Sequence, residues 1–315
     1  MSQIDTGADR QEQPGEGPGT LERPSAKPVP RWRETLSVLL ANRLAVFGLV
    51  LLALLLLTAI FADQLARYPI NAQNLAERFS PPSGEYWFGT DELGRDLYSR
   101  VVMGSRISLQ VGAVSVGISL VAGTLIGLIA GYRGGWVDTV WMRTMDVLFA
   151  FPVILLAIAL VAVLGPSLRN TMIAVGIVFT PIFARVVRGS VLSVREELHV
   201  RAVRSLGASD WRIIGRHVLP NVAAPIIVQA SLSLAFAILT EAALSFVGVG
   251  VQPPDPAWGL MLSDAQRYQT QGWWLSVFPG AAIFLTVMAF NLLGDGLRDA
   301  LDPKQRSVIE SRGVE

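Results

Sequence analysis

The sequence predicts an all-α integral membrane protein with about six transmembrane helices and with both termini in the cytoplasm. Of its 315 residues, 51% are hydrophobic and only 16% are charged, whereas soluble domains carry about 25% charged residues. The mean hydropathy is +0.46, and the charged residues are concentrated between long uncharged runs. Because lipid cannot solvate charge, this distribution predicts apolar spans joined by polar loops.

The residue inventory limits the chemistry that the chain can perform. It contains no cysteine and two histidines, His199 and His217. Disulfides, thiolate catalysis and cysteine-based metal sites are therefore excluded, and a metal centre built from histidine alone is not expected. We expect no catalytic residue and no metal site in this chain.

Residues 1–40 are predicted to form a disordered cytoplasmic tail. Proline and glycine recur through residues 1–30, where apolar side chains are few. Such a segment buries too little surface to offset the entropy that it would lose on ordering. It lacks the basic start and apolar centre of a cleavable signal peptide.

Six apolar runs follow this tail. A transmembrane helix needs about 20 apolar residues to cross a hydrocarbon core of about 30 Å. The runs cover residues 44–62, 107–131, 147–168, 170–184, 218–240 and 268–294. We therefore expect a first transmembrane helix at 41–63, an extracytoplasmic segment at 64–105, a core of five spans at 106–296 and a cytoplasmic tail at 297–315.

Basic residues set the predicted orientation. The segment 185–216 alone carries seven arginines. With the N-terminus in the cytoplasm, only seven of the 26 Lys and Arg residues of the chain lie outside. Since cytoplasmic loops are enriched in Lys and Arg, both termini and this loop are placed in the cytoplasm.

Between the first two spans, residues 90–101 predict an amphipathic helix on the outer membrane surface. Thr90 would cap it, and two acidic residues follow in the first turn, where the helix dipole favours them. The pairs Asp91–Arg95 and Asp96–Arg100 have the i, i+4 spacing of helical ion pairs. The opposite face is an apolar stripe of Leu93, Leu97 and Val101.

The second span carries a ladder of small residues, one every four positions. This spacing lines one helical face, and small faces let membrane helices approach closely. The ladder serves either packing within this chain or contact with a second membrane subunit. Its members are Ser115, Ser119, Gly123, Gly127 and Gly131.

The cytoplasmic loop 197–220 predicts two short helices around a glycine. In the first, Leu198, Ala202 and Leu206 share one face. Gly207 can take the left-handed conformation that often ends a helix. The second helix is expected to present Trp211, Ile214 and Val218 together, and Pro220 is tolerated in the first turn of the next span.

This loop resembles the cytoplasmic signature of bacterial ABC importer permeases, a Glu-Ala-Ala start, a glycine and an apolar-x-Leu-Pro ending. Ala202, Gly207, Leu219 and Pro220 match at the right spacing, while Arg201 replaces the family's Glu. The family uses the loop as a coupling helix that docks on the ATPase. The resemblance thus implies a set of coupling residues: Glu197, Val200, Arg201, Ala202, Val203, Leu206, Gly207, Ala208, Leu219 and Pro220. Glu196 or Glu197 could make the contact of the family's Glu, or the contact could differ. The alternative for the whole segment is a basic loop that only follows the enrichment of Lys and Arg in cytoplasmic loops.

Further motifs narrow the resemblance. The segments 88–96, 143–152, 241–248, 252–254 and 258–259 are similar to the C-type permease of dipeptide and oligopeptide importers, and the similarity covers about residues 35 to 300. It implies an ABC importer type-1 permease fold in the bacterial cytoplasmic membrane, translocating peptides by alternating access. It implies a second permease subunit, two ATPase domains and an extracytoplasmic binding protein as partners, in contact with lipid and without nucleic acid. ATP and magnesium would be bound by the ATPase partners, because this chain contains no G-x-x-x-x-G-K-[ST] phosphate loop.

Two acidic residues near the membrane boundaries call for an interpretation. Glu241, near the outer end of the fifth span, is either part of an outer gate or translocation path or close enough to the interface to reach water. Asp146 near Arg143 is expected to be a partnered charge at the inner boundary. Prolines within the spans predict kinks, and three tryptophans fit an aromatic belt; these are Pro152, Pro181, Trp258, Trp273 and Trp274.

A secondary transporter driven by an ion gradient is the main alternative. That class predicts intramembrane acids and an internal repeat. Glu241 is the one candidate acid, no clear repeat is visible, and the class does not account for the 197–220 loop. A membrane scaffold without transport activity is a third possibility.

Overall fold

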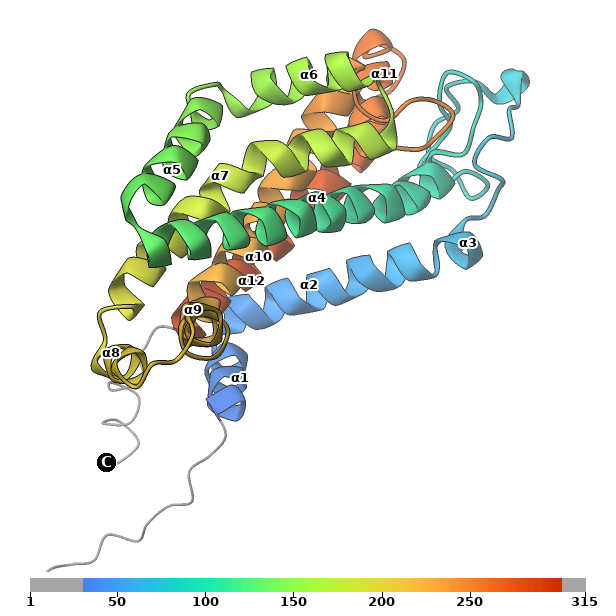
Figure 1. The fold of residues 1–315 in the computed structure, drawn as a ribbon. Helices are drawn as coiled ribbons and strands as arrows, with labels where there is room; N and C mark the ends of the chain where they lie inside the picture. Colours follow the sequence, from blue (N-terminus) through green and yellow to red (C-terminus); the bar gives the residue numbers. More distant parts are fainter. Residues whose placement is uncertain (1–30, 302–315) are drawn as a thin grey trace, which may run out of the picture.

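The computed structural model describes residues 31–301, with side chains from residue 35 onward, and these residues form a bundle of helices without a β-strand (Figure 1). Thr90 and Asp96 form an isolated antiparallel β-bridge. In chain order the helices are α1 Arg31–Ala41, α2 Arg43–Ile60, α3 Ala62–Leu65, a 3₁₀ turn at Leu75–Glu77, α4 Leu97–Arg133, α5 Gly135–Phe149, α6 Val153–Leu164, α7 Leu168–Val194, α8 Leu198–Ser205, α9 Asp210–Ile213, a π-helical turn at Ile214–Val218, α10 Leu219–Val247, α11 Trp258–Arg267 and α12 Trp274–Leu301.

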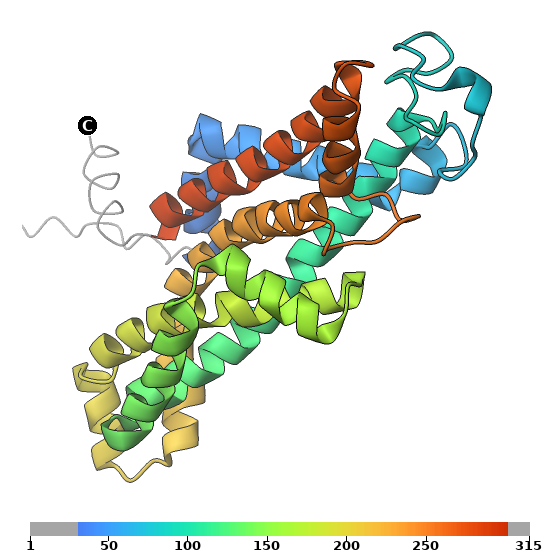
Figure 2. The same cartoon turned by 90° about the horizontal axis from the view of Figure 1, so that it is seen from above.

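Within residues 31–301, five helices are long and apolar enough to cross a membrane, and the number is six if the bent pair α5–α6 is counted as one span. The five are α2, α4, α7, α10 with its preceding turns, and α12. The axes of these helices are roughly aligned along the bundle. Helices α1, α8 and α9 lie at the same end as the start of α2 (Figures 1 and 2). This arrangement agrees with the predicted fold class and with a shared cytoplasmic side for these elements.

The third predicted span, 147–168, is not one continuous helix, and the kink that the sequence predicts at Pro152 is a break between two helices. Its apolar run crosses the end of α5, a break and then α6, and the two helices are bent by 93°. Pro152 lies at the break with ψ 130, outside the helical region. Because proline has no N–H to donate and its ring crowds the preceding turn, a continuous apolar run becomes two short helices. Pro181, in contrast, lies inside α7 without ending it.

The small-residue ladder of α4 packs against α7 of the same chain. A Cβ on Gly123 would lie 2.5 Å from the Phe183 Cβ, and one on Gly127 would lie 2.6 Å from the Ala184 carbonyl oxygen. Ser115 adds a hydrogen bond from its Oγ to the Met172 carbonyl oxygen at 3.0 Å. The structure therefore places the ladder in contacts within the chain rather than on a free face.

The amphipathic helix predicted at 90–101 is wrong for residues 90–96, because α4 begins only at Leu97. Asp91 Oδ1 accepts hydrogen bonds from the backbone N–H groups of Leu93 and Arg95, both at 2.9 Å, which closes a turn before the helix. Asp96 is the N-cap, and its Oδ2 accepts a hydrogen bond from the Ser99 N–H at 2.9 Å. Asp91 and Asp96 thus satisfy backbone donors instead of decorating a helical surface.

At the N-terminal side, residues 31–40 are helical rather than disordered, which corrects that part of the predicted tail. Leu39 is buried with Ala45 of α2 and Ala300 of α12, so this segment has an apolar face that offsets the entropy of ordering. The chain then turns at Asn42, whose side chain accepts hydrogen bonds from the first N–H groups of α2. Residues 1–30 and 302–315 of the two predicted tails lie outside the described residues, and α12 extends to Leu301.

Arg106 of α4 fixes the outer end of α2. Its Nε donates to the Ala59 carbonyl oxygen at 3.0 Å and its Nη2 to the Ile60 carbonyl oxygen at 3.2 Å. These are carbonyls of the last helical turn, which have no partner inside their own helix. Asp63 accepts from Arg106 Nη1 at 3.1 Å, so one guanidinium binds three oxygens at this junction.

Candidate coupling site and outer polar cluster

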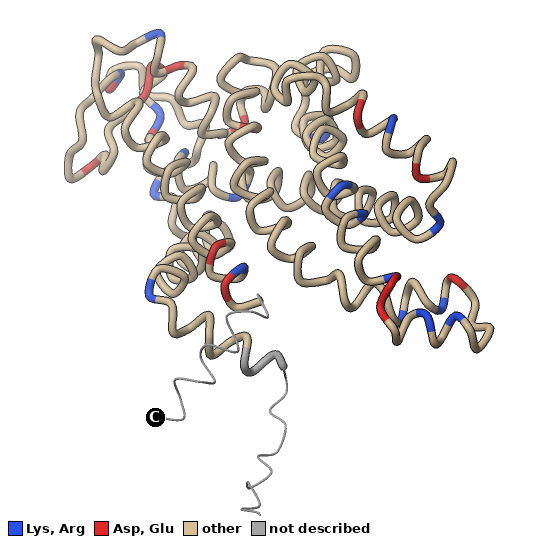
Figure 3. The backbone as a smooth tube through the Cα atoms, turned by 90° about the vertical axis from the view of Figure 1, so that its left-hand side faces the viewer, with Lys and Arg blue, Asp and Glu red and all other residues tan. Residues whose placement is uncertain are grey.

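The 197–220 loop forms a compact unit at the end of the bundle. Helix α8 is followed by Gly207 with φ +77 and then by α9, as the sequence predicts. In Figure 1 both short helices are seen nearly end-on, crossing the direction of α4 and α7. Figure 3 shows this loop with several basic positions, which are all arginine, beside acidic ones.

The inner face of this unit is packed on the ends of the transmembrane helices. Val200, Ile213 and Val218 are fully buried. They belong to one apolar cluster with residues of α4 and α7: Leu128, Tyr132, Val187, Val191 and Val194. Since packed cores resist deformation, a displacement of α8 or α9 would move the ends of α4 and α7 with it.

Polar contacts reinforce this connection. The Tyr132 hydroxyl of α4 donates to Asp210 Oδ1 of α9 at 3.2 Å, and the Arg204 guanidinium carbon of α8 lies 4.9 Å from the centre of the Tyr132 ring. Arg195, which follows α7, donates from Nη1 to the Gly131 carbonyl oxygen at 2.7 Å. The last turns of α4 and α7 and both loop helices are therefore joined by hydrogen bonds and a cation–π contact.

The outer face of the unit is apolar and exposed. Leu198 is 84% exposed, Leu206 is 86% exposed and Trp211 is 65% exposed. Leu198, Ala202 and Leu206 share the face that the sequence predicts for α8. Large apolar side chains on a water-facing surface indicate a contact with another protein.

The predicted apolar face of the second helix differs from the observed one. Trp211 points outward, whereas Ile214 and Val218 are buried. Ile213 is buried with Ile214 and Val218 in the same apolar cluster, so the packed side of this helix is centred on Ile213 and leaves Trp211 on the opposite side. Pro220 lies in the first turn of α10, as predicted.

The candidate coupling residues divide between the two faces. Val200 is buried, and Val203 and Ala208 are partly buried against the inner cluster. Glu197 precedes α8, and its Oε2 lies 3.2 Å from His199 Nδ1, while Glu196 pairs with Arg195 at 3.1 Å. The remaining members are exposed: Arg201, Ala202, Leu206, Gly207, Leu219 and Pro220.

Asp146 is a partnered charge, as expected. Its closest partner is Arg185 of α7, with Nη2 to Oδ1 at 2.8 Å, and Arg143 lies at 3.8 Å. A second pair, Arg188–Asp138, joins the same two helices with Nη2 to Oδ2 at 2.6 Å. The sequence order alone pointed to Arg143, because Arg185 reaches Asp146 only through the packing of α5 on α7.

Glu241 lies inside the chain, which corrects the reading that it reaches water, while a part in an outer gate stays a prediction. Its side chain is 0% exposed. Oε1 accepts a hydrogen bond from Ser245 at 2.8 Å and Oε2 accepts one from Ser108 of α4 at 3.3 Å. Ser245 Oγ in turn accepts from the Val251 N–H at 3.0 Å. Glu241 therefore ties α10 to α4 and to the loop after α10 instead of reaching water.

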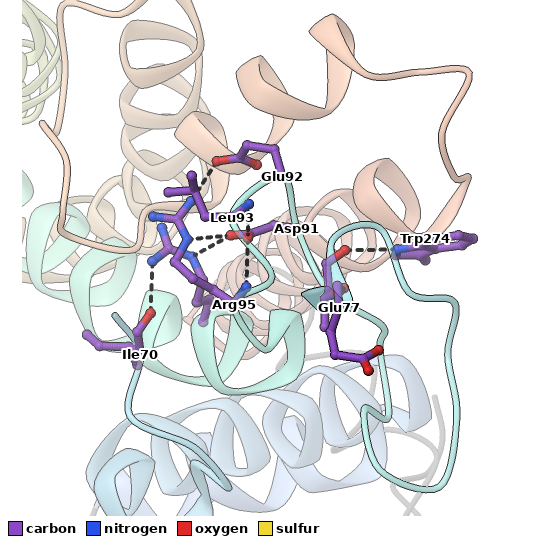
Figure 4. Close-up of polar contacts among 9 residues, drawn as sticks. Ile70, Glu77, Asp91, Glu92, Leu93, Arg95 and Trp274 are labelled. Atoms are coloured by element: carbon purple, nitrogen blue, oxygen red, sulfur yellow. Dashed lines mark hydrogen bonds and ion pairs between the residues drawn. The ribbon is translucent and has the colours of Figure 1, made fainter. Parts of the chain in front are cut away.

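A cluster of buried charges lies at the opposite end of the bundle (Figure 4). Asp91 Oδ2 lies 2.6 Å from Arg95 Nε and 3.7 Å from Arg100 Nε, and Glu92 Oε1 lies 2.7 Å from Arg95 Nη2. Asp264 of α11 lines the same small pocket. Burial raises the pKa of Glu92 and of Asp264 above their ordinary values.

Hydrogen bonds of Trp274 and Thr90 hold the outer segment against α12. The Trp274 indole N–H donates to the Thr90 carbonyl oxygen at 3.3 Å, and the Thr90 hydroxyl donates to the Glu77 carbonyl oxygen. Trp258, also expected in an aromatic belt, is 1% exposed and donates to the Val101 carbonyl oxygen at 2.9 Å. Trp274 is likewise buried, so of the three predicted belt residues only Trp273 is largely exposed. The indole N–H groups explain why these two rings are inside, because each has a backbone acceptor.

Comparison with known proteins agrees with this architecture. Residues 123–307 match the family described as the binding-protein-dependent transport system inner membrane component. Residues 30–82 match the N-terminal transmembrane domain of oligopeptide transport permease C.

Curated relatives match nearly the whole chain. A dipeptide transport system permease protein of Alkalihalophilus pseudofirmus is 50% identical over 279 residues, which is 89% of this chain and 92% of the relative. A glutathione transport system permease protein of Pectobacterium atrosepticum is 47% identical over 277 residues, which is 88% of this chain and 92% of the relative.

The fold also has a solved counterpart. A chain of the methionine ABC transporter MetNI in inward-facing conformations superposes with a TM-score of 0.55 at 18% identity, covering 64% of this chain and 96% of that chain. At this identity the likeness concerns the fold alone. Taken with the family matches and the relatives, it leads to one conclusion: the chain belongs to the binding-protein-dependent transport system inner membrane components, the multi-pass permease subunits of ABC importers.

Proposed function

We propose that this permease moves short peptides across the cytoplasmic membrane and that the 197–220 loop couples it to its ATPase. The observation that carries the proposal is the two-faced loop. Its inner side is buried on α4 and α7, while Leu198, Leu206 and Trp211 face outward. A coupling element needs both features, a rigid attachment to the spans and a free surface for the motor.

The names of the relatives support a peptide substrate. They are permeases for dipeptides, for glutathione and, in Escherichia coli, for D,D-dipeptides at 46% identity over 267 residues. These substrates share a short length and peptide bonds. We infer that this chain transports molecules of the same kind.

The proposed assembly contains a second permease, two ATPase domains and an extracytoplasmic binding protein. ATP and magnesium are bound in the ATPase partners, and this chain contributes no catalytic group. Closure of the ATPase domains would press on the exposed face of α8 and α9, and the buried face would pass that displacement to α4 and α7. Since a ligand shifts an equilibrium only through a difference in affinity, the loop must contact the ATPase differently in the inward- and outward-facing states.

Uptake by the reconstituted complex tests this proposal. The complex with its ATPases, in proteoliposomes supplied with the binding protein and labelled dialanine, should accumulate peptide only when ATP is present. Collapse of proton and sodium gradients by ionophores should leave uptake unchanged. Uptake that persists without ATP and stops with the ionophores would contradict the proposal in favour of a gradient-driven transporter.

A further inference from the structure

We propose that the face of α10 bearing Gln229, Ser233 and Thr240 lines the path of the transported molecule, and that the Gln229 carboxamide contacts it. The proposal rests on the proposed function for the nature of that molecule, a short peptide. It moves the candidate path from Glu241, which is buried inside the chain, to a face of the same helix that borders a pocket. On this face Gln229 is half-buried, while Ser233 and Thr240 are 1% and 7% exposed.

This face of α10 borders a pocket of about 380 Å³. Helices α6, α7 and α10, which contact one another, form its walls, and Figures 1 and 2 show α6 beside α7 on this side of the bundle. Three polar side chains of α10 lie among apolar ones. The lining residues that matter here are Ile154, Phe179, Gln229, Ser233, Phe236 and Thr240.

A second hollow of similar size, on another face of α10, has a different lining. It has a volume of about 370 Å³ and lies between α4 and α10. Ile226 and Ile227 of α10 face it together with leucine, valine and alanine side chains, and Thr124 is its single polar lining residue. One helix thus carries an apolar face toward α4 and a polar stripe toward α6 and α7.

The hydrogen bonds on the polar stripe leave capacity for a ligand. Gln229 Nε2 donates to Ser233 Oγ at 3.0 Å, and Thr240 Oγ1 donates to the Phe236 carbonyl oxygen at 2.8 Å. A carboxamide has two N–H donors and one carbonyl acceptor. Among residues 31–301, the bond to Ser233 is the hydrogen bond found for the Gln229 side chain, so its carbonyl oxygen and second N–H are available.

Position and chemistry both suit a peptide. Gln229 is ten residues after Leu219, or about 15 Å along α10 at 1.5 Å per residue, which places it within the membrane. Exposing an amide to hydrocarbon is costly because lipid offers no hydrogen bond. A peptide backbone offers the same donor and acceptor groups as the carboxamide, so each can satisfy the other while the peptide passes.

The absence of cysteine from the chain provides a direct test. Gln229→Cys and Ile227→Cys would each carry the single thiol of this subunit, two residues apart and on different faces of α10. The assembled complex in proteoliposomes would be treated with a charged, membrane-impermeant methanethiosulfonate reagent, and the modified fraction of this subunit measured by mass spectrometry. We expect Gln229→Cys to react at least about tenfold faster, because the thiolate is the reactive form and lipid suppresses it.

Transport supplies the second readout. Dialanine under turnover should slow modification of Gln229→Cys. Gln229→Leu should raise the dialanine concentration that gives half-maximal uptake by roughly five- to tenfold, the effect expected for one hydrogen bond, whereas Ile227→Leu should leave it unchanged.

The outcomes separate this inference from the proposed function. If the wild-type complex transports dialanine but Gln229→Cys is as unreactive as Ile227→Cys, lipid or the second permease covers the face and the inference is wrong. Normal uptake by Gln229→Leu, with Gln229→Cys reactive but unprotected, would contradict the peptide contact. If Gln229→Cys is reactive and the wild-type complex takes up no peptide, the path assignment stands and the proposed substrate fails.

Discussion

Tyr132, in the last turn of α4, donates its phenolic hydrogen to Asp210 Oδ1 of the coupling loop across 3.2 Å. Arg204 of α8 lies against the same ring, with its guanidinium carbon 4.9 Å from the centroid. Both short helices of the loop therefore meet on one side chain of a transmembrane helix. The consequence is a direct route from the surface of the loop to the span.

Tyr132→Phe tests this route. The substitution keeps the ring and removes a hydrogen bond with a net contribution of about 1 kcal/mol. We expect the complex to assemble normally but to hydrolyse up to about fivefold more ATP per transported peptide, because the loop is held less firmly. Tyr98→Phe, at the outer end where the ring packs on Trp87 and Phe88, is the control. An unchanged ATP-to-peptide ratio in Tyr132→Phe would show that this bond does not serve coupling.

Gly207→Val should impair coupling without impairing membrane insertion. Gly207 has φ +77 and open space around the position of a Cβ, so the penalty arises from the backbone alone, at roughly 1–2 kcal/mol for a residue with a side chain. Valine should be worse than alanine, and asparagine, which tolerates this region, should be mildest. Uptake and substrate-stimulated ATP hydrolysis are the measurements.

Gly215 offers the matched control for Gly207. It also has open space around a Cβ, and its φ is not in the left-handed region. Gly215→Ala should therefore transport normally. Full transport and normal stimulation by Gly207→Val would mean that the 197–220 loop is not the coupling element.

Gly127→Leu should destabilise this chain rather than its pairing with another subunit. A Cβ at this position would lie 2.6 Å from a backbone oxygen of α7, and overpacking of this kind costs about 1–3 kcal/mol. The expected result is a lower melting temperature and lower yield in detergent. Gly117→Leu, on the same helix with nothing within 4 Å, should be tolerated. A stable Gly127→Leu chain that loses its partner subunit would instead assign the ladder to the subunit interface.

Leu206→Asp and Val200→Asp should separate the two faces of the coupling loop. Leu206 is 86% exposed and Val200 is 0% exposed. We expect Leu206→Asp to leave the chain stable but to weaken co-purification of the ATPase about tenfold or more, since it places a charge in a buried contact. Val200→Asp should destabilise the chain itself, because a charge would enter the inner cluster. Co-purification of the ATPase at wild-type levels with Leu206→Asp would contradict the docking role of this face.

The outer cluster should be more stable at lower pH. Burial raises the pKa of Asp264 above its ordinary value of 3.8 and also raises that of Glu92 above 4.5. An acid with a raised pKa binds its proton more tightly in the folded form, so its stabilising contribution is full below the ordinary value and is lost as the pH rises through the folded pKa. Proteolysis of the outer segment should therefore slow as the pH falls from 7 toward 4. Asp264→Asn should flatten this dependence, and an equally steep profile in the variant would show that Asp264 does not contribute.

Hydropathy was sufficient to predict five of the spans because lipid excludes charge whatever the tertiary structure. At 147–168 hydropathy gave only the apolar run, and the proline predicted the kink, which the structure shows as a 93° bend between α5 and α6. Local spacing likewise predicted the two helices around Gly207, since their ends are set by nearby residues. It failed for Trp211, because the side of this short helix that is buried, with Ile213 and Ile214, is set by its packing on the transmembrane helices rather than by local spacing.

The polar residues were harder to place because their partners are distant in the sequence. Asp91 could be paired with Arg95 from spacing, but the turn that it closes also depends on its bonds to backbone N–H groups. From the sequence alone, Glu241 suggested a gate, because an acid within a span has no visible partner. The structure supplies two serine partners, one from α4 and one from the next turn of α10. Nothing in the local sequence around Gln229 indicates a site, because only the arrangement of α6, α7 and α10 places it at a pocket.

The contact of Arg106 with the last carbonyls of α2 has a consequence for the order of synthesis. Residues 59 and 60 leave the ribosome more than 40 positions before Arg106. Until the second span emerges, those carbonyl oxygens can bond only to water at the membrane surface. The first span is therefore inserted with an unfinished end, and its attachment to the rest of the permease is completed by a residue that the ribosome adds later.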